Sequence, residues 1–211
     1  MIVVVDYGLG NLASVQRAIR YLGKNVTVTD NAKKIAAADS LILPGVGAFA
    51  HGMMNLNEKG LINEIKHFSV EEKPLLGICL GMQLLMSIGE ESGINKGLDL
   101  IQGKVLHFSQ FEQFDRSYKV PHIGWNALEV PRKEASWDDT ILDGIPVNSY
   151  VYFVHSFVVV PNNDDHVLAS TIYGDLQYCA VAQKRSIYGC QFHPENSGEV
   201  GLQILKNFLS I

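Results

Sequence analysis

A cysteine between two glycines is the first pattern in this sequence that could do chemistry. Gly77-Ile78-Cys79-Leu80-Gly81 has the form of a nucleophile elbow with cysteine in the serine position. The apolar residues before it predict a strand and those after it predict a helix, which is the context that an elbow requires. N–H groups at a helix N-terminus favour a thiolate, and the N–H of Leu80 could stabilise an oxyanion. The alternative is a buried cysteine flanked by packing glycines.

A histidine near the end of the chain is the best candidate for the base that such a nucleophile needs. His193 ends the apolar run 187–192, and Glu195 stands two positions further on. Residues i and i+2 of an extended chain project to the same face, about 7 Å apart, a gap that long side chains can close. Glu195 could therefore orient the imidazole and stabilise its protonated form, as the third group of a triad does. A surface ion pair at a turn remains the alternative.

Two glycine-containing turns follow other predicted strands. Pro44-Gly45-Val46-Gly47 could turn backbone N–H groups toward a ligand as a second oxyanion donor, or could be an ordinary turn before a helix. Gly8-Leu9-Gly10-Asn11-Leu12-Ala13 matches the dinucleotide-binding fingerprint, with Asp30 about 20 residues later. Dinucleotide binding would give no function to the elbow or to the His-x-Glu pair. The rest of the chain also offers no obvious second half of a dinucleotide fold.

The elements that must position these residues alternate between strand and helix in the first half of the chain. Apolar, often β-branched runs predict strands at 2–6, 26–29, 40–43 and 74–78. Apolar residues at helical spacing predict helices at 12–22, 61–68 and 80–86. This alternation predicts an α/β fold with an open, mostly parallel, flavodoxin-like sheet, helices on both faces, and a site at the carboxyl ends of the strands.

After about residue 98 the pattern changes to short strand-like runs with few helices. These runs are 120–128, 150–160, 166–173, 178–183 and 187–192, and an amphipathic helix at 201–209 closes the chain. We expect antiparallel strands added to the same sheet, so that residues 1–211 form one domain. His155 lies within one of these runs, where it could be a core histidine with satisfied hydrogen bonds.

Composition excludes several classes of protein. The chain has 211 residues, 47% of them hydrophobic, and a net charge of −5 with no basic block, which disfavours nucleic acid as a partner. The long uncharged stretches are too short or too interrupted to cross a bilayer, and the N-terminus has no basic leader, so a soluble cytoplasmic protein is expected. Three cysteines without a CxxC pair or zinc spacing disfavour a disulfide scaffold and a structural metal, and no cofactor is expected.

Taken together, these motifs resemble the class I (triad-type) glutamine amidotransferases, and most closely the glutaminase subunits of imidazole glycerol phosphate synthases. The segments that carry the resemblance are Asp6-Tyr7-Gly8, Gly10-Asn11, Leu43 to Phe49, Gly77 to Leu84, Pro121 to Asn126, Tyr152 to Ser156 and Gln191 to Glu195. The resemblance implies that Cys79 attacks the side-chain amide of L-glutamine, that His193 moves the proton, and that Glu195 orients His193. It assigns oxyanion stabilisation to Leu80, Gly45 and Val46, and glutamine binding to Gln83, His155, Ser156 and Phe157.

The resemblance also implies a partner. In the family, the glutaminase docks on a (β/α)8-barrel cyclase as a heterodimer, and ammonia passes through the barrel to give imidazole glycerol phosphate in histidine biosynthesis. Residues expected toward this interface are Tyr7, Asn11, His122, Trp125 and Asn196, with packing in a loop as the alternative for His122 and Trp125. Asn196 departs from the lysine usual at its position, which leaves open a paralogue that supplies a cyclase-like synthase making amidino groups on bacterial surface sugars. A hydrolase or peptidase on the same sheet is a further alternative.

Overall fold

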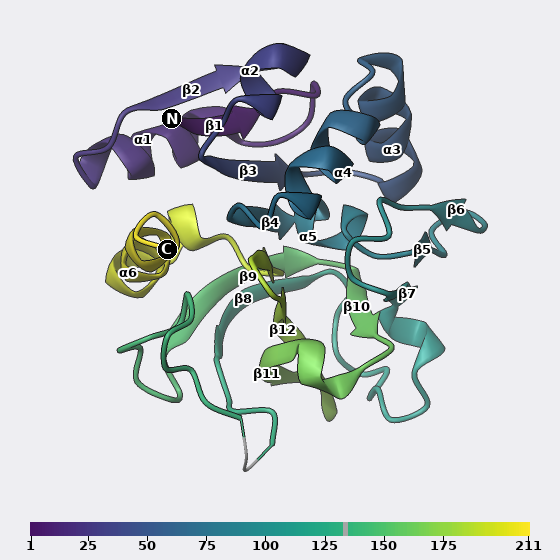
Figure 1. The fold of residues 1–211 in the computed structure, drawn as a ribbon. Coiled ribbons are helices and arrows are strands. Elements are labelled where there is room, and N and C mark those ends of the chain that lie inside the picture. The colour runs from purple at the N-terminus through teal and green to yellow at the C-terminus, as the bar shows by residue number, and fades with distance from the viewer. Residues whose placement is uncertain (133–134) are drawn as a thin grey trace.

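A computed structural model describes residues 1–132 and 135–211, and within them the main sheet has seven strands (Figure 1). The strands in spatial order are β11 (Val167–Tyr173), β12 (Leu176–Lys184), β13 (Ile187–Cys190), β4 (Leu75–Cys79), β3 (Ser40–Gly45), β1 (Ile2–Val5) and β2 (Val26–Thr29). The run from β13 to β2 is parallel, whereas β11 and β12 pair antiparallel. The prediction of an open, mostly parallel sheet with antiparallel additions is confirmed.

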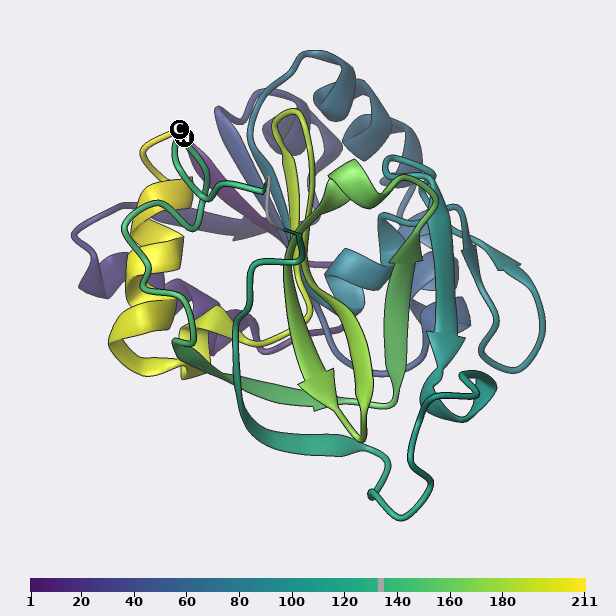
Figure 2. The same cartoon turned by 90° about the horizontal axis from the view of Figure 1, so that it is seen from below.

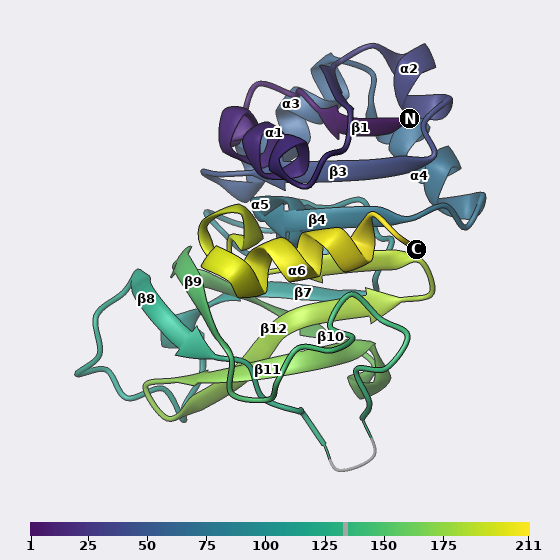
Figure 3. The ribbon, with the colours of Figure 1, turned by 90° about the vertical axis from the view of Figure 1, so that its left-hand side faces the viewer.

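Helices cover both faces of this sheet, because neighbouring residues of a buried strand point to opposite sides. The helices are α1 (Leu12–Tyr21), α2 (Ala32–Ala36), α3 (Phe49–Glu58), α4 (Ile62–Val70), α5 (Leu80–Leu84) and α6 (Gly198–Phe208). Val4 belongs to the core under α1 and α6, whereas Val3 and Val5 belong to the core under α2, α3 and α4. Figure 3 shows α1 and α6 together on one face of the sheet.

Helix α3 was not predicted, since we expected only one helix, at 61–68, after strand β3. Its buried residues Phe49, Gly52 and Leu56 do follow a helical spacing. However, a glycine, a histidine and two asparagines, which are all weak helix formers, obscure the pattern. None of the described helices combines the length and apolar character needed to cross a bilayer.

Part of the second half builds smaller sheets, which corrects the expectation that all its strands join the main one. Strands β10 (Phe157–Pro161), β7 (Gly103–His107), β5 (Ile88–Gly89) and β6 (Asn95–Lys96) form a four-stranded sheet, and β8 (His122–Ala127) pairs with β9 (Tyr150–His155). The predicted strand 150–160 is therefore two strands that change partners at Ser156, whose carbonyl accepts a hydrogen bond from Phe108 N–H. Figure 2 shows the teal and green strands of these smaller sheets from below.

Two glycines allow the start of α5 to pack in direct contact with the backbone of β3 and β4. A Cβ atom on Gly81 would overlap the carbonyl oxygen of Leu43 in strand β3, and one on Gly77 would lie 2.7 Å from Gly81 C and Met82 N. Both contacts are with backbone, which cannot rotate away as a side chain can. The flanking glycines predicted from the elbow pattern are therefore required by packing at the turn that carries Cys79.

We expect Gly81→Ala to lower the free energy of unfolding by about 1–3 kcal/mol or more, because the added methyl group has no free volume beside Leu43. Unfolding in urea, followed by circular dichroism, measures this loss. Gly52→Ala on α3 is the matched control: its new methyl group meets only the ends of Leu84 and Leu80, and alanine favours a helix over glycine by about 1 kcal/mol. Equal stability of the two variants would contradict this account.

Candidate active site

Cys79 occupies the sharp turn between β4 and α5 in a backbone conformation that few residues adopt. Its φ is 53° and its ψ is −110°, a combination that costs of order 1–3 kcal/mol for a residue with a side chain. Strain of this kind persists only where the surrounding packing imposes it, and here the packing is that of Gly77 and Gly81. The predicted order of strand, turn and helix is confirmed, with the residue 6% exposed.

Strand pairing brings His193 to this turn from the other end of the chain. β13 lies directly beside β4, with Cys190 opposite Ile78, so the segment after β13 emerges next to the segment after β4. His193 N–H donates to the Tyr152 carbonyl at 3.0 Å, and the Ser197 hydroxyl donates to the His193 carbonyl at 2.7 Å. The backbone of His193 is thus fixed on both sides.

The predicted pairing of His193 with Glu195 is present, and it is buried. His193 Nδ1 donates to Glu195 Oε1 at 2.8 Å, and the two side chains are 6% and 1% exposed. This burial rules out the alternative of a surface ion pair. Because Nδ1 is committed to the carboxylate, Nε2 is the ring atom left to exchange a proton, and it is buried without a hydrogen-bond partner among the described residues.

Charge and hydrogen bonding decide the protonation of His193. Burial lowers its pKa, but the nearby Cys79 side chain and the hydrogen-bonded Glu195, together with the negative charges that both groups can carry, outweigh burial and raise the pKa to about 10. The imidazolium form is therefore favoured once the thiol has lost its proton. A cysteine, a histidine and a carboxylate in this order have the arrangement of a nucleophile, its base and the group that orients the base.

Cys79 and His193 line a cavity of about 270 Å³. The other residues around it are Val46, Gly47, Leu80, Gln83, Glu91, Val154, His155, Ser156 and Phe157. Most of the residues predicted for the site from the sequence are thus brought together at one hollow. Glu195 lies behind His193, and Gly45 lies opposite Cys79 in the pairing of β3 with β4.

The Gly45-Val46-Gly47 turn packs directly against the elbow. A Cβ atom on Gly45 would lie 2.9 Å from the Leu80 Cβ and would overlap the Tyr7 hydroxyl, so only glycine fits there. Gly47 has a φ of 101°, which a residue with a side chain rarely adopts, and Val46 is exposed to the cavity. This turn and the start of α5 are the backbone segments nearest to the thiol that could offer N–H groups to an oxyanion.

One wall of the cavity is held by a hydrogen-bond chain through two neutral histidines. His155 Nδ1 donates to the Phe157 carbonyl at 2.8 Å, so its Nε2 accepts from the Tyr178 hydroxyl at 3.0 Å. The Tyr178 oxygen in turn accepts from His122 Nδ1 at 3.0 Å. Burial lowers the pKa of His155 to about 3 and that of His122 to about 4, so neither can replace His193 as a base at neutral pH. His155 is a satisfied core histidine that also lines the cavity.

Glu91 is a site residue that sequence reasoning missed. It lies in the loop after β5, its Oε2 accepts from Phe49 N–H at 2.7 Å, and it is the acid among the described residues lining the cavity. No motif surrounds it in the sequence, and only the fold brings its loop over the elbow. A carboxylate at this place offers a negative charge to a cationic group in the cavity.

The structure corrects the expected partner contacts of Tyr7 and His122. Tyr7 is fully buried beneath Gly45, and His122 is buried in a stack with Phe153 and Tyr173, so neither side chain can form part of a contact surface. The other three residues expected at the interface, Asn11, Trp125 and Asn196, are exposed. Trp125 is 51% exposed on the outer face of β8.

The dinucleotide fingerprint has a structural explanation. Asn11 caps α1 through its side chain, which accepts from Ser14 N–H, and Gly10 lies close to the backbone of Gly45. Asp30, which would have to bind a ribose hydroxyl, is paired with Lys59 at 2.9 Å. The glycines therefore serve the packing of the first turn against β3.

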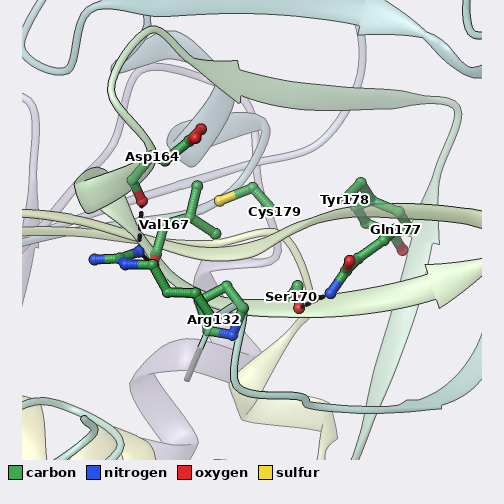
Figure 4. Close-up of a pocket in the computed structure, with 8 residues that line it drawn as sticks. Arg132, Asp164, Val167, Ser170, Gln177, Tyr178 and Cys179 are labelled. Atoms are coloured by element: carbon green, nitrogen blue, oxygen red, sulfur yellow. Dashed lines mark hydrogen bonds between the residues drawn. The ribbon is translucent and has the colours of Figure 1, made fainter. Parts of the chain in front are cut away.

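A second cavity of about 290 Å³ lies over β11 and β12 and contains another cysteine (Figure 4). Arg132 in it already donates to the carbonyls of Asp164 and Val167 and to the Asp165 carboxylate. Burial raises the pKa of the Cys179 thiol, so this sulfur stays protonated. No histidine is among the described residues lining this cavity, and no described side chain is hydrogen-bonded to the Cys179 sulfur.

Comparisons with known proteins show what the whole chain is similar to. The family described as glutamine amidotransferase class-I matches residues 3–211. Imidazole glycerol phosphate synthase subunit HisH 1 of Legionella pneumophila (strain Paris) is 48% identical to this chain, and the match covers 99% of this chain and 98% of the relative. Imidazole glycerol phosphate synthase subunit HisH of Methanosarcina barkeri (strain Fusaro) is also 48% identical, and the match covers 100% of this chain and 98% of the relative. A crystal structure of a glutamine amidotransferase superposes on this chain with a TM-score of 0.73, and the match covers 100% of this chain and 98% of the other. The two sequences are 19% identical, so this likeness concerns the fold alone.

We expect the His193 ring to titrate near pH 10 in the folded chain, and at lower pH in Glu195→Gln, which keeps the shape of the partner but removes its charge. NMR of the histidine ring protons measures both midpoints, and His155, neutral throughout this range, is an internal control. Because the folded pKa exceeds the unfolded value of about 6.5, stabilisation from His193 is present below that pH and is lost as pH rises through about 10. An ordinary midpoint in both proteins would contradict the coupling.

Proposed function

The chain belongs to the class-I glutamine amidotransferase family, and we propose from this premise that it is the glutaminase subunit of an imidazole glycerol phosphate synthase. It hydrolyses L-glutamine to glutamate and ammonia, and the ammonia serves the synthesis of imidazole glycerol phosphate in histidine biosynthesis. The observation that carries the proposal is the strained Cys79 beside a buried His193–Glu195 pair, in a chain 48% identical to subunits of that name.

The reaction follows from the geometry around Cys79. The proton of the Cys79 thiol first passes to His193 Nε2, which has no other partner among the described residues, and the thiolate then attacks the side-chain amide carbon of glutamine. The tetrahedral intermediate then expels ammonia, which receives the proton from His193, and a γ-glutamyl thioester remains on Cys79. Water attacks this thioester with His193 as base, and glutamate leaves as the thiol is restored.

Both tetrahedral intermediates carry negative charge on the former amide oxygen. We assign its stabilisation to the N–H of Leu80, which follows the nucleophile, and to the Gly45-Val46 turn, which lies opposite Cys79 across the paired strands. The glycines of that turn leave room for the backbone to approach the substrate.

The cavity also has groups for the rest of the glutamine molecule. We assign the α-ammonium group to Glu91, the one carboxylate at the described wall of the cavity, and the neighbouring backbone to the segment from His155 to Phe157. Gln83 Nε2 donates to the carbonyl of Phe157 and to Gln191 Oε1, both at 3.2 Å. Both amide protons of Gln83 are thereby used, and its Oε1 is the atom left to accept a hydrogen bond from the substrate.

A subunit needs a partner, and the exposed face beside the cavity is suited to one. Ile123 and Trp125 on β8 lie opposite Val154 and Tyr152 on β9, and the first three side chains are exposed. The Val154 carbonyl accepts from the Cys79 thiol at 3.9 Å, so this face adjoins the nucleophile. We propose that a (β/α)8-barrel cyclase covers it in a heterodimer, together with Asn11 and Asn196, and receives the ammonia.

The names of the relatives favour the histidine pathway over the surface-sugar alternative. Relatives from Legionella, Moorella and Chlorobaculum, which are 41% to 48% identical over nearly the whole chain, are named as imidazole glycerol phosphate synthase subunits. Asn196 therefore changes one expected charge contact without moving the chain to another activity. That residues 1–211 act as one domain, in the cytoplasm and without a cofactor, stays part of this proposal.

We expect Cys79→Ala to abolish glutamine hydrolysis, because no other group at the site can form the thioester. Glutamate release, measured with the partner present or with the chain alone at high protein concentration, tests this. Cys190→Ala is the matched control, since Cys190 is buried and burial raises the pKa of its thiol. Activity retained by Cys79→Ala, with the fold intact by circular dichroism, would refute the assignment.

We expect Glu91→Gln to raise the KM for glutamine by about ten- to a hundredfold, with a smaller effect on kcat. The variant keeps an oxygen that can accept from Phe49 N–H, but it loses the charge that attracts the α-ammonium group, and a hydrogen bond to a charged group is worth about 1.5–3 kcal/mol. Steady-state kinetics with glutamine measure the change. Glu90→Gln, on the neighbouring residue outside the cavity lining, is the control, and an equal KM in the two variants would contradict the role of Glu91.

A further inference from the structure

Gln191 is a fully buried polar residue that the mechanism above has not used. It lies between the end of β13 and His193, and its N–H donates to the Ala180 carbonyl at 2.9 Å. Its neighbours Cys190 and Phe192 point into the apolar core on the side of α1 and α6. Since alternate residues of an extended segment point to opposite faces, the side chain of Gln191 points the other way, toward the elbow.

The amide of Gln191 bridges two residues of the site. Its Oε1 accepts from Gln83 Nε2 at 3.2 Å, and its Nε2 donates to the Cys79 sulfur at 3.8 Å. A buried amide is costly unless it is hydrogen-bonded, and here both partners belong to the cavity that binds the substrate. An apolar residue of the same size would fill the space equally well, so the amide needs another explanation than packing.

We propose that Gln191 is a positioning residue of the glutaminase, which supplies a hydrogen bond to the Cys79 thiolate and fixes the orientation of the Gln83 amide. The proposal rests on the function assigned above. A hydrogen bond from a neutral N–H to a charged sulfur is stronger than one to a thiol, so Gln191 favours the nucleophilic form of Cys79.

The second part of the role concerns Gln83. The two ends of its amide differ, because Nε2 offers two donors and Oε1 only acceptors. The Phe157 carbonyl and Gln191 Oε1 take both donors, so Oε1 stays free for the substrate. Without Gln191, the amide can rotate and present N–H groups to the N–H groups of the substrate amide. Loss of Gln191 should therefore weaken glutamine binding as well as thiolate formation.

Two variants separate these effects in the full-length chain. Gln191→Leu removes both hydrogen bonds at similar volume. We expect the pH midpoint for alkylation of Cys79 by iodoacetamide to rise by about one unit, as for loss of one hydrogen bond to a charged atom, and the KM for glutamine to rise about tenfold. Gln191→Glu keeps an acceptor for Gln83 but places a carboxyl group beside the sulfur, so the midpoint should rise as much or more while the KM changes less.

Alkylation of Cys79 needs no glutamine, so this measurement is independent of the assigned reaction. If the wild-type chain hydrolyses no glutamine, the proposed function is wrong. If the alkylation midpoint of Gln191→Leu is unchanged, only the role of Gln191 is wrong. Mass spectrometry locates the label, and Cys79→Ala should remain unlabelled because burial raises the pKa of the Cys179 and Cys190 thiols and keeps them protonated. Gln203→Leu on α6, whose amide bonds only Asn207 among the described residues, is the matched control and should shift nothing. If Gln191→Leu fails to fold, Gln191→Met, an unbranched neutral side chain that also lacks the amide, decides: an unchanged midpoint overturns the proposal, and a raised one supports it.

Discussion

The contact of α5 with the ends of β3 and β4 is the constraint on which the site depends. Because Gly77 and Gly81 carry no side chains, the helix can begin against the backbone of Leu43, and the chain must then reverse within a single residue. That residue is Cys79, whose positive φ is the result of this reversal. The strained backbone places Cys79 at the end of its strand, where it borders both the core and the cavity.

The remaining groups reach the sulfur through sheet pairing. Strand β13 beside β4 delivers His193 and Glu195, strand β3 on the other side delivers the Gly45 turn, and the bend at Ser156 between β9 and β10 supplies the opposite wall. Each comes from a different part of the chain, and parallel register aligns their ends. The buried sheet therefore acts as a rigid frame, and the loops that carry the chemistry need little flexibility of their own.

The sequence predicted those features of the site that depend on short segments of the chain. The glycines around Cys79 and the i, i+2 spacing of His193 and Glu195 describe short segments whose geometry depends on few neighbours, and both were found as expected. Glu91 and the bridging amide of Gln191 were not identified, because their roles arise only from residues brought close by tertiary contacts. The burial of Tyr7 and His122 and the smaller sheets were missed for the same reason, since propensity does not specify which surfaces pack together. Helix α3 was missed because weak helix formers obscure its spacing.

The hydrogen bonds from His122 through Tyr178 to His155 have a direction. The Phe157 carbonyl can only accept, so His155 must donate to it, Tyr178 must donate to His155, and His122 must donate to Tyr178. The Phe157 carbonyl therefore determines the direction of all three hydrogen bonds. If the direction were reversed, the lone pair of His155 Nδ1 would face the carbonyl oxygen of Phe157, and neither atom could donate. Strand β8, which carries Trp125 on its outer face, is thereby joined through His122 on its inner face to the carbonyl that accepts from Gln83, so one continuous row of hydrogen bonds connects this strand with the wall of the cavity.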